Sequence, residues 1–179
     1  MRLAIADPPY LGRGVRWYGG GVGRGRGEGV ADNHPDAAIW DRPEAHLELV
    51  ARLTADFDGW AIAASSDSLA VYLSACPPDA QVLVWHRRNA PPSGARMRNA
   101  WEPVILRMPA NRRGRSGSFD SLDDVLDIGS QRIGFTGSKP PAWTRWVLAA
   151  LGYDPAEDHL TDVFAGSGSV TLAANGMLI

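Results

Sequence analysis

Short, largely apolar runs recur along the chain, and their lengths are typical of buried β-strands. They predict strands at residues 2–6, 59–65, 80–87 and 101–108, and a last strand that ends at Phe164. The first run stops at an Asp-Pro-Pro sequence, and two consecutive prolines end a strand. The third and fourth runs are separated by a polar segment that can join them as a long hairpin.

Between these runs, apolar residues recur at the spacing of amphipathic helices. This pattern predicts helices at residues 42–57, 67–78 and 140–152. Asp67 is suited to cap the second helix, and Gly152 is suited to end the third. The polar stretch 121–128 fits one or two helical turns. Strands that alternate with helices predict an α/β fold with a mainly parallel sheet.

Two segments show neither pattern. Residues 11–30 are rich in glycine and arginine and predict a mobile loop, because glycine is costly to order. Residues 109–137 are polar and predict a small variable insert. No boundary between domains is evident, and 179 residues are enough for one domain with a core of its own. We therefore expect a single domain spanning residues 1–179.

Composition excludes several classes of protein. Hydrophobic residues make up 45% of the chain and charged residues 21%, as in ordinary soluble domains. No apolar run approaches the roughly 20 residues of a membrane span, and the N-terminal apolar run is too short for a signal peptide. We therefore expect a cytoplasmic protein with no membrane partner. The single cysteine, Cys76, excludes an internal disulfide, and four scattered histidines predict no metal site.

Arginine dominates the basic residues. Lys139 is the one lysine among 18 basic residues, and many of the arginines gather in three clusters. The planar guanidinium suits phosphate, so the clusters offer candidates for contact with nucleic acid: Arg13, Arg16, Arg112 and Arg113. A GC-rich coding bias combined with solvated loops explains the same composition, and both explanations stay open.

Ligands of open α/β sheets bind beyond the carboxyl ends of strands, so two strand ends are of particular interest. After the last strand, "AGSGSV" places Gly166 and Gly168 in a turn where the backbone can approach a ligand, with a helix behind it. The turn lacks the third glycine of a dinucleotide-binding loop and the Gly-Lys-Ser/Thr of a phosphate-binding loop. A plain strand-to-helix turn therefore explains this stretch equally well.

The first strand ends in "DPPY", residues 7–10. Pro8 and Pro9 fix the backbone and remove two N–H donors, so the Asp7 carboxylate and a proline carbonyl are two acceptors held in place. Two fixed acceptors suit a donor with two hydrogens, namely an exocyclic amino group. The Tyr10 ring can stack on a flat base, which contributes about 1–3 kcal/mol in nucleic-acid complexes. The alternative is a turn in which Asp7 is a cap and Tyr10 belongs to the core.

Together these motifs resemble the amino-group DNA methyltransferases, which act on adenine N6 or cytosine N4. Residues 7–10 match the catalytic motif of that family, and "DVFAGSGSV" at 162–170 is similar to its cofactor motif. The "KPP" at 139–141, with the helix after it, resembles the segment that precedes the cofactor motif. The catalytic motif comes first and the cofactor motif last, as in the circularly permuted beta group of the family.

The resemblance implies a Rossmann-like, circularly permuted fold that binds S-adenosylmethionine and methylates a base amino group in DNA. It implies that the catalytic residues are Asp7, Pro8, Pro9 and Tyr10. It implies that the cofactor site includes Lys139, Asp162, Phe164, Gly166, Ser167 and Gly168. A motif that begins with Asp favours adenine over cytosine, and DNA ranks above RNA as the partner.

Two departures from the family pattern favour an alternative to the methyltransferase hypothesis. In the family, a further strand after the cofactor motif ends in an acid that holds the cofactor ribose, and this sequence, shortened at its C-terminal end, has no matching residue. A homodimer or a partner protein would then complete the sheet edge. The segment 109–137 is too short for a separate target-recognition domain. The alternative function is therefore a catalytically inactive, methyltransferase-like module that binds nucleic acid or a partner.

Other residues carry weaker signals. Trp85, His86 and Trp101 are expected in the core rather than in a site, and Glu102 is expected to be a solvated or salt-bridged acid. Methylation of a protein glutamine ranks low, because Asn usually stands at the position of Asp7 in proteins of that kind.

Overall fold

The computed structural model describes residues 1–19, 36–92, 95–113, 121–130 and 138–165, together with residues 170, 174 and 176. Within these residues one sheet is formed by β1 (Arg2–Ala6), β2 (Gly59–Ala63), β3 (Gln81–His86), β4 (Trp101–Arg107), β5 (Val125–Asp127) and β6 (His159–Asp162). Their order across the sheet is β5-β3-β4-β2-β1-β6. The strands expected from the apolar runs are all present, close to their expected bounds.

The sheet mixes parallel and antiparallel pairs, which decides where the strand ends lie. β1 pairs in parallel with β2 and β6, and β3 pairs in parallel with β5. β4 runs antiparallel to β2 and β3, so β3 and β4 form the expected hairpin. Because β4 runs the opposite way, its amino end lies at the edge of the sheet where β1, β2 and β6 have their carboxyl ends.

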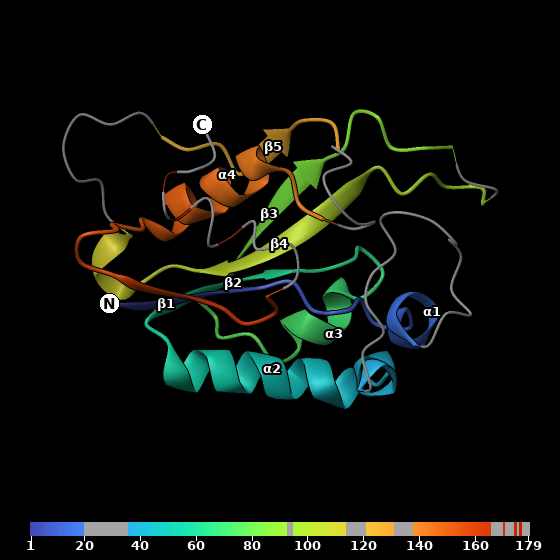
Figure 1. Ribbon diagram of the computed structural model, residues 1–179, viewed down its shortest axis with the longest axis horizontal. Coiled ribbons are helices and arrows are strands. Elements are labelled where there is room, and N and C mark those ends of the chain that lie inside the picture. The colour runs from blue at the N-terminus through green and yellow to red at the C-terminus, as the bar shows by residue number, and fades with distance from the viewer. Residues whose placement is uncertain are drawn as a thin grey trace.

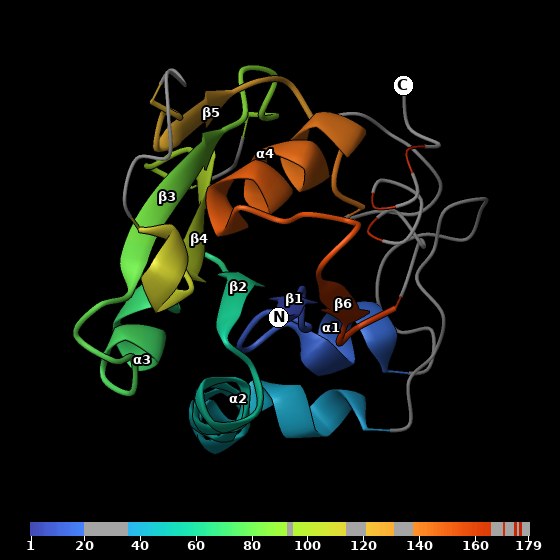
Figure 2. The same ribbon diagram turned by 90° about the vertical axis from the view of Figure 1, so that its left-hand side faces the viewer.

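Helices cover both faces of the sheet. They are α1 (Gly14–Tyr18), α2 (Pro43–Asp56), α3 (Leu69–Leu73) and α4 (Pro141–Leu151), with the 3-10 helices η1 (Ala37–Asp41) and η2 (Ala110–Arg112). α4 lies on one face and α2 and α3 lie on the other, so the sheet is the middle layer of three (Figure 1 and Figure 2). α1 lies at the end of the sheet opposite the N-terminus (Figure 1). No helix in the described part of the chain is long and apolar enough to cross a membrane.

Strand β1 is packed on both of its faces. Leu3 and Ile5 belong to the core cluster on the α4 side, and Ala4 and Ala6 belong to the cluster on the α2 side. All four side chains are buried, as expected of a strand in the interior of an α/β sheet. β1 is therefore held by two neighbouring strands and two helical layers, and the residues that follow it extend from a rigid base.

Three segments differ from the sequence prediction. Residues 14–18, inside the stretch 11–30 expected to be a mobile loop, form α1. The Asp41 carboxylate stabilises this helix by accepting hydrogen bonds from the N–H groups of Gly14 (2.6 Å) and Val15 (3.0 Å). The rest of that stretch, from residue 20 to residue 30, lies outside the described residues.

The stretch expected to form a helical turn contributes a strand instead. Residues 125–127 form β5 and pair with the carboxyl end of β3. Leu126 packs against the core on the α4 side, while the residues on either side of it are exposed. The pairing with β3 supplies hydrogen bonds and a partly buried position for Leu126, which a short helical turn would lack.

The second helix is shorter than predicted, and its cap differs. α3 covers only residues 69–73, and Asp67 does not cap it. The Asp67 carboxylate pairs with Arg13 (2.7 Å), and the hydroxyl of Ser68 donates a hydrogen bond to the carbonyl of Ser65 (2.9 Å).

Candidate active site

The two strand ends that carry the motifs are neighbours in space. β1 and β6 run in parallel with Ile5 paired to Asp162, and the N–H of Val163 donates to the carbonyl of Ile5 (2.9 Å). Both strands therefore end at the same edge of the sheet. The "DPPY" segment and the residues that lead into the glycine turn emerge side by side, although they lie at opposite ends of the sequence.

A lysine ammonium lies against the Asp7 carboxylate. Lys139 Nζ is 2.9 Å from each Asp7 oxygen and 3.0 Å from the hydroxyl of Tyr10. It also lies 5.2 Å from the ring centre of Tyr10 and 5.8 Å from that of Trp143, distances at which aromatic rings attract a cation. The Lys139 side chain is 6% exposed and that of Asp7 is 32% exposed, so solvent reaches the pair through the carboxylate.

A second carboxylate comes from the beginning of β4. The Tyr10 hydroxyl donates to Glu102 Oε2 (2.6 Å), and the same oxygen lies 3.7 Å from Lys139 Nζ. The other oxygen, Oε1, pairs with Arg87 (2.9 Å). Glu102 reaches this place because β4 starts at the edge where β1 ends. We call Asp7, Tyr10, Arg87, Glu102 and Lys139 the polar cluster.

The polar cluster borders a pocket of about 350 Å³, a volume at the lower end of the range for small-molecule sites. All members of the cluster except Arg87 line the pocket, together with Pro8, Arg13, Arg16, Trp17, Tyr18 and Asn99. α1 forms part of the wall because it docks closely on η1 at Gly14, where a Cβ would lie 2.1 Å from the carbonyl oxygen of Ala37. In the described parts of the chain, no group of three or more His, Cys, Asp and Glu side chains is placed to hold a metal ion.

Burial and neighbouring charges shift the proton affinities in the polar cluster. Burial raises the pKa of the Asp7 carboxyl, and the Glu102 charge acts in the same direction, against the opposing effect of Lys139. Burial lowers the pKa of Lys139, but the two carboxylates outweigh it and hold this pKa above its ordinary value. Burial and then the Glu102 charge raise the pKa of Tyr10 well above its usual range. At neutral pH the cluster therefore contains an ammonium group and a neutral phenol.

The residues expected to bind a cofactor fall in different places. Lys139 lines the pocket, whereas Asp162, the last residue of β6, and Phe164, which follows the strand, do not line it. Burial raises the pKa of the Asp162 carboxyl, which accepts a hydrogen bond from the N–H of Phe164 (3.3 Å). The Phe164 ring packs edge-on against Trp40 on the α2 side, with 4.9 Å between ring centres. The remaining candidates, Gly166, Ser167 and Gly168, lie outside the described residues.

Two of the arginines expected to contact nucleic acid lie at the pocket. Arg13 and Arg16 both line it. Arg13 pairs with Asp67, and the guanidinium of Arg16 lies over the ring of Trp17, 5.6 Å from its centre. α1 and the residue before it therefore bring two cations and two aromatic rings to the pocket.

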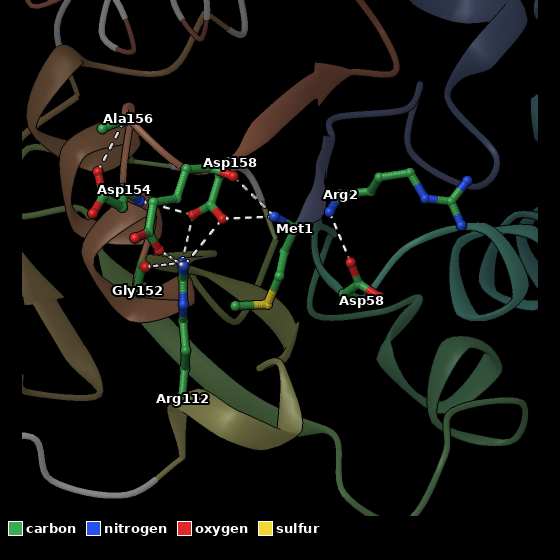
Figure 3. Close-up of polar contacts among 9 residues, drawn as sticks. Met1, Arg2, Asp58, Arg112, Gly152, Asp154, Ala156 and Asp158 are labelled. Atoms are coloured by element: carbon green, nitrogen blue, oxygen red, sulfur yellow. Dashed lines mark hydrogen bonds and ion pairs between the residues drawn. The ribbon is translucent and has the colours of Figure 1, made fainter.

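The other two arginines, Arg112 and Arg113, lie near the amino end of β1. Arg112 Nη2 donates to Asp158 (3.0 Å), whose carboxylate also accepts from the N-terminal ammonium (3.0 Å) (Figure 3). Arg113 pairs with Asp79. The five residues of β1 separate this region from the pocket, a rise of roughly 17 Å. The structure does not bring Arg112 and Arg113 to the site.

Sequence reasoning overlooked Glu102 and Arg87 as members of the site. Glu102 is salt-bridged, as expected, but its position at the pocket was not foreseen. An acid near the start of the otherwise apolar strand "WEPVILRM" is the available signal, because acids are depleted in strands. Trp85 is a core residue as expected, with its indole N–H donating to the carbonyl of Ile128 (3.1 Å). His86 and Trp101 face each other across the β3–β4 ladder and do not line the pocket.

Comparisons with known proteins bear on the fold. No family model matches the sequence, and no curated protein matches it. Among solved structures, a chain in the crystal structure of an M1.HpyAVI–SAM complex is similar, where SAM is S-adenosylmethionine. The TM-score is 0.59, the match covers 98% of this chain and 78% of that chain, and 15% of residues are identical. At this identity the likeness concerns the fold, and the expected α/β fold of S-adenosylmethionine-dependent methyltransferases is confirmed.

Proposed function

We propose that this protein is an S-adenosylmethionine-dependent DNA methyltransferase that methylates an exocyclic amino group of a base, adenine N6 in first place. The pocket beside the joined ends of β1 and β6 is the observation that carries the proposal. Asp7, Pro8 and Tyr10 of the "DPPY" segment line this pocket together with Lys139. The fold shared with the M1.HpyAVI–SAM complex supports the choice of cofactor.

The catalytic residues act by positioning the amino group. The Asp7 carboxylate accepts one of its hydrogens and the Pro8 carbonyl accepts the other, so that the nitrogen lone pair turns out of the base plane. An aromatic amine is a weak nucleophile, and this orientation is the main contribution to the rate. As the N–C bond forms, the nitrogen gives up a proton to Asp7, whose raised pKa suits it to accept one. Pro9 keeps the segment rigid, and Tyr10 stacks on the base.

The residues present fit the cofactor. When bound, S-adenosylmethionine would supply a methyl group on a sulfonium for transfer to the base nitrogen, and the electron pair of its C–S bond would stay on sulfur. Asp162, the last residue of β6, is an acid suited to the cofactor's amino group, and Lys139 borders the pocket. By the resemblance to the family motif, Phe164, Gly166, Ser167 and Gly168 complete this half of the site.

DNA is the proposed partner, and RNA ranks below it. Arg13 and Arg16 line the pocket and supply positive charge for phosphates on either side of a base that has left the duplex. β6 is an edge strand of the described sheet, so a second copy or a partner protein that adds a strand there is part of the proposal. Arg112 and Arg113, which pair with acids elsewhere, are not.

Calorimetric titration with S-adenosylmethionine tests the proposal first. We expect micromolar binding by the wild type and by Asp7→Asn, and none by Gly166→Arg, because a long side chain would fill the glycine turn. Asp127→Asn removes a carboxylate on β5 that pairs with Arg88 outside the pocket, and it serves as the matched control. An absence of binding by the wild type at millimolar cofactor would contradict the proposal and favour a binding module without turnover.

Methyl transfer to DNA is the second measurement. We expect label from the cofactor to appear in DNA with the wild type and with Asp127→Asn, and Asp7→Asn to be slower by roughly 100-fold or more. Chromatography of the hydrolysed nucleosides then separates N6-methyladenine from N4-methylcytosine. Label in cytosine alone would leave the reaction type intact and overturn the preference for adenine.

A further inference from the structure

The acceptor that the proposed reaction needs is occupied by a side chain of the protein itself. Lys139 Nζ lies 2.9 Å from both oxygens of Asp7, so the ammonium holds the carboxylate that would receive the base amino group. Each oxygen keeps a further lone pair, but a base amino group that binds Asp7 competes with the ammonium for the same negative charge. Because the Lys139 side chain is almost fully buried, it cannot simply exchange Asp7 for water, and a buried cation without a partner is costly.

Glu102 offers the second position for the ammonium. Its Oε2 lies 3.7 Å from Lys139 Nζ, and a shift of about 1 Å would bring the two atoms to hydrogen-bond distance. The Tyr10 hydroxyl lies between the carboxylates, 3.0 Å from Nζ and 2.6 Å from Oε2. The ammonium can therefore move between the two acids while it keeps its contact with Tyr10.

We propose that Glu102 is a positioning residue that takes over the Lys139 ammonium from Asp7 when a base amino group enters the pocket. This inference rests on the proposed function and adds to it a step that prepares the site. Glu102 acts through Lys139 and Asp7 and does not itself touch the methyl group.

The surroundings of Glu102 suit this role. Arg87 pairs with Oε1 at 2.9 Å and is itself tethered to the carbonyl of Asn99 (2.6 Å), so one oxygen of Glu102 is fixed while Oε2 faces the cluster. Two carboxylates and two cations remain in contact whichever acid holds the lysine. The exchange therefore moves one charge by a short distance and leaves no buried charge without a partner.

Glu102 also loosens the hold of Lys139 on Asp7 before a base arrives. Burial has the largest effect on the pKa of Asp7 and raises it, Lys139 lowers it, and the Glu102 charge raises it. If glutamine replaced Glu102, Asp7 would be the one anion beside the ammonium. The pair would tighten, and the pKa of Asp7 would fall.

Kinetics of Glu102→Gln test the role in the reaction. The substitution keeps the size and removes the charge, and we expect kcat to fall by roughly 10- to 100-fold, since misplacement by about 1 Å can cost as much as 100-fold. The KM for DNA and the Kd for the cofactor should stay at wild-type values. Glu102→Asp restores the charge and should recover part of the loss, and Asp127→Asn should behave as wild type. A kcat for Glu102→Gln within twofold of wild type overturns the inference.

Two measurements that need no turnover separate this inference from the proposed function. An NMR titration of the Asp7 carboxyl should show a lower pKa in Glu102→Gln than in the wild type. A crystal structure of Asp7→Asn, in which the first acid is gone, should show Lys139 Nζ within hydrogen-bond distance of Glu102 Oε2. If the wild type neither binds the cofactor nor transfers a methyl group, the proposed function fails, and these two results still decide. The inference that Glu102 takes over the ammonium is overturned if the Asp7 pKa is unchanged in Glu102→Gln, or if Lys139 stays away from Glu102 in Asp7→Asn.

Discussion

Asp158 is expected to stabilise the fold through its charge, at the end of β1 away from the pocket. Its side chain is fully covered, with 0% of its surface exposed. Burial alone would raise its pKa, but hydrogen bonds from Arg112, from the N–H of Asp154 and from the N-terminal ammonium lower it from 3.8 to about 2. A shift of that size corresponds to about 2.5 kcal/mol, and solvent around the partly exposed partners, the N-terminal ammonium and Arg112, reduces it to about 1–2 kcal/mol. We expect Asp158→Asn to lose this amount at neutral pH.

The pH dependence identifies the source of the loss. Because the folded-state pKa of Asp158 is lowered, its contribution is present above the unfolded value of 3.8 and is lost as pH falls toward about 2. Urea unfolding followed by tryptophan fluorescence at several pH values between 7 and 3 measures it. At neutral pH the thermal midpoint should fall by roughly 2–8 °C. Glu157→Gln, an exposed acid 4.0 Å from Arg112, is the matched control and should change stability by less than about 0.5 kcal/mol. A difference between Asp158→Asn and wild type that is as large near pH 3 as at pH 7 would refute the reasoning.

Three further predictions concern residues that shape the site or its support. Gly14→Ala should detach α1 from η1, because the new Cβ would lie 2.1 Å from a carbonyl oxygen, and faster proteolysis within residues 11–19 would report it. Burial lowers the pKa of His46, so the folded protein should lose stability as pH falls below about 6.5. In His46→Gln, the thermal unfolding midpoint should therefore change less between pH 7 and pH 5 than it does in the wild type. Gly152→Ala should destabilise by about 1 kcal/mol in urea unfolding, because Gly152 ends α4 with φ +67°. The first expectation would be contradicted by an unchanged proteolysis rate in Gly14→Ala. The second would be contradicted by a wild-type pH dependence of the thermal midpoint in His46→Gln, and the third by an unchanged urea midpoint in Gly152→Ala.

The parts of the fold that could be predicted are those whose residues decide their structure locally. The run that forms β1 is apolar on both faces, so no other element fits it as well. Gly152 adopts the left-handed conformation that ends a helix, as its place after an apolar segment indicated. β5 could not be predicted, because Leu126 is the one inward-facing residue among the three of the strand. Its conformation depends on pairing with β3, which lies far from it in the sequence.

The candidate site was predictable only where a motif lies on a strand end. Asp7 and Lys139 could be singled out from their motifs, and the structure places them 2.9 Å apart. Glu102 required the direction of β4 and its register, and neither is encoded by the residues next to it. Arg112 shows the converse, because it belongs to a basic cluster in the sequence and yet pairs with Asp158 about a strand length from the pocket. Clustering along the chain does not predict clustering in space.

The pairing of β1 with β6 also has a consequence for how the site is built during folding. β1 is the first strand in the sequence, yet Asp7 and its partner Lys139 are 132 residues apart. Closing a loop of that length costs about 4 kcal/mol of chain entropy, and contacts with such separations slow folding. During synthesis the "DPPY" segment is made before the residues that complete its pocket. A nascent or cleaved chain that lacks residues 138–162 has neither the Lys139 ammonium nor β6. The site can therefore form only when the fold is complete.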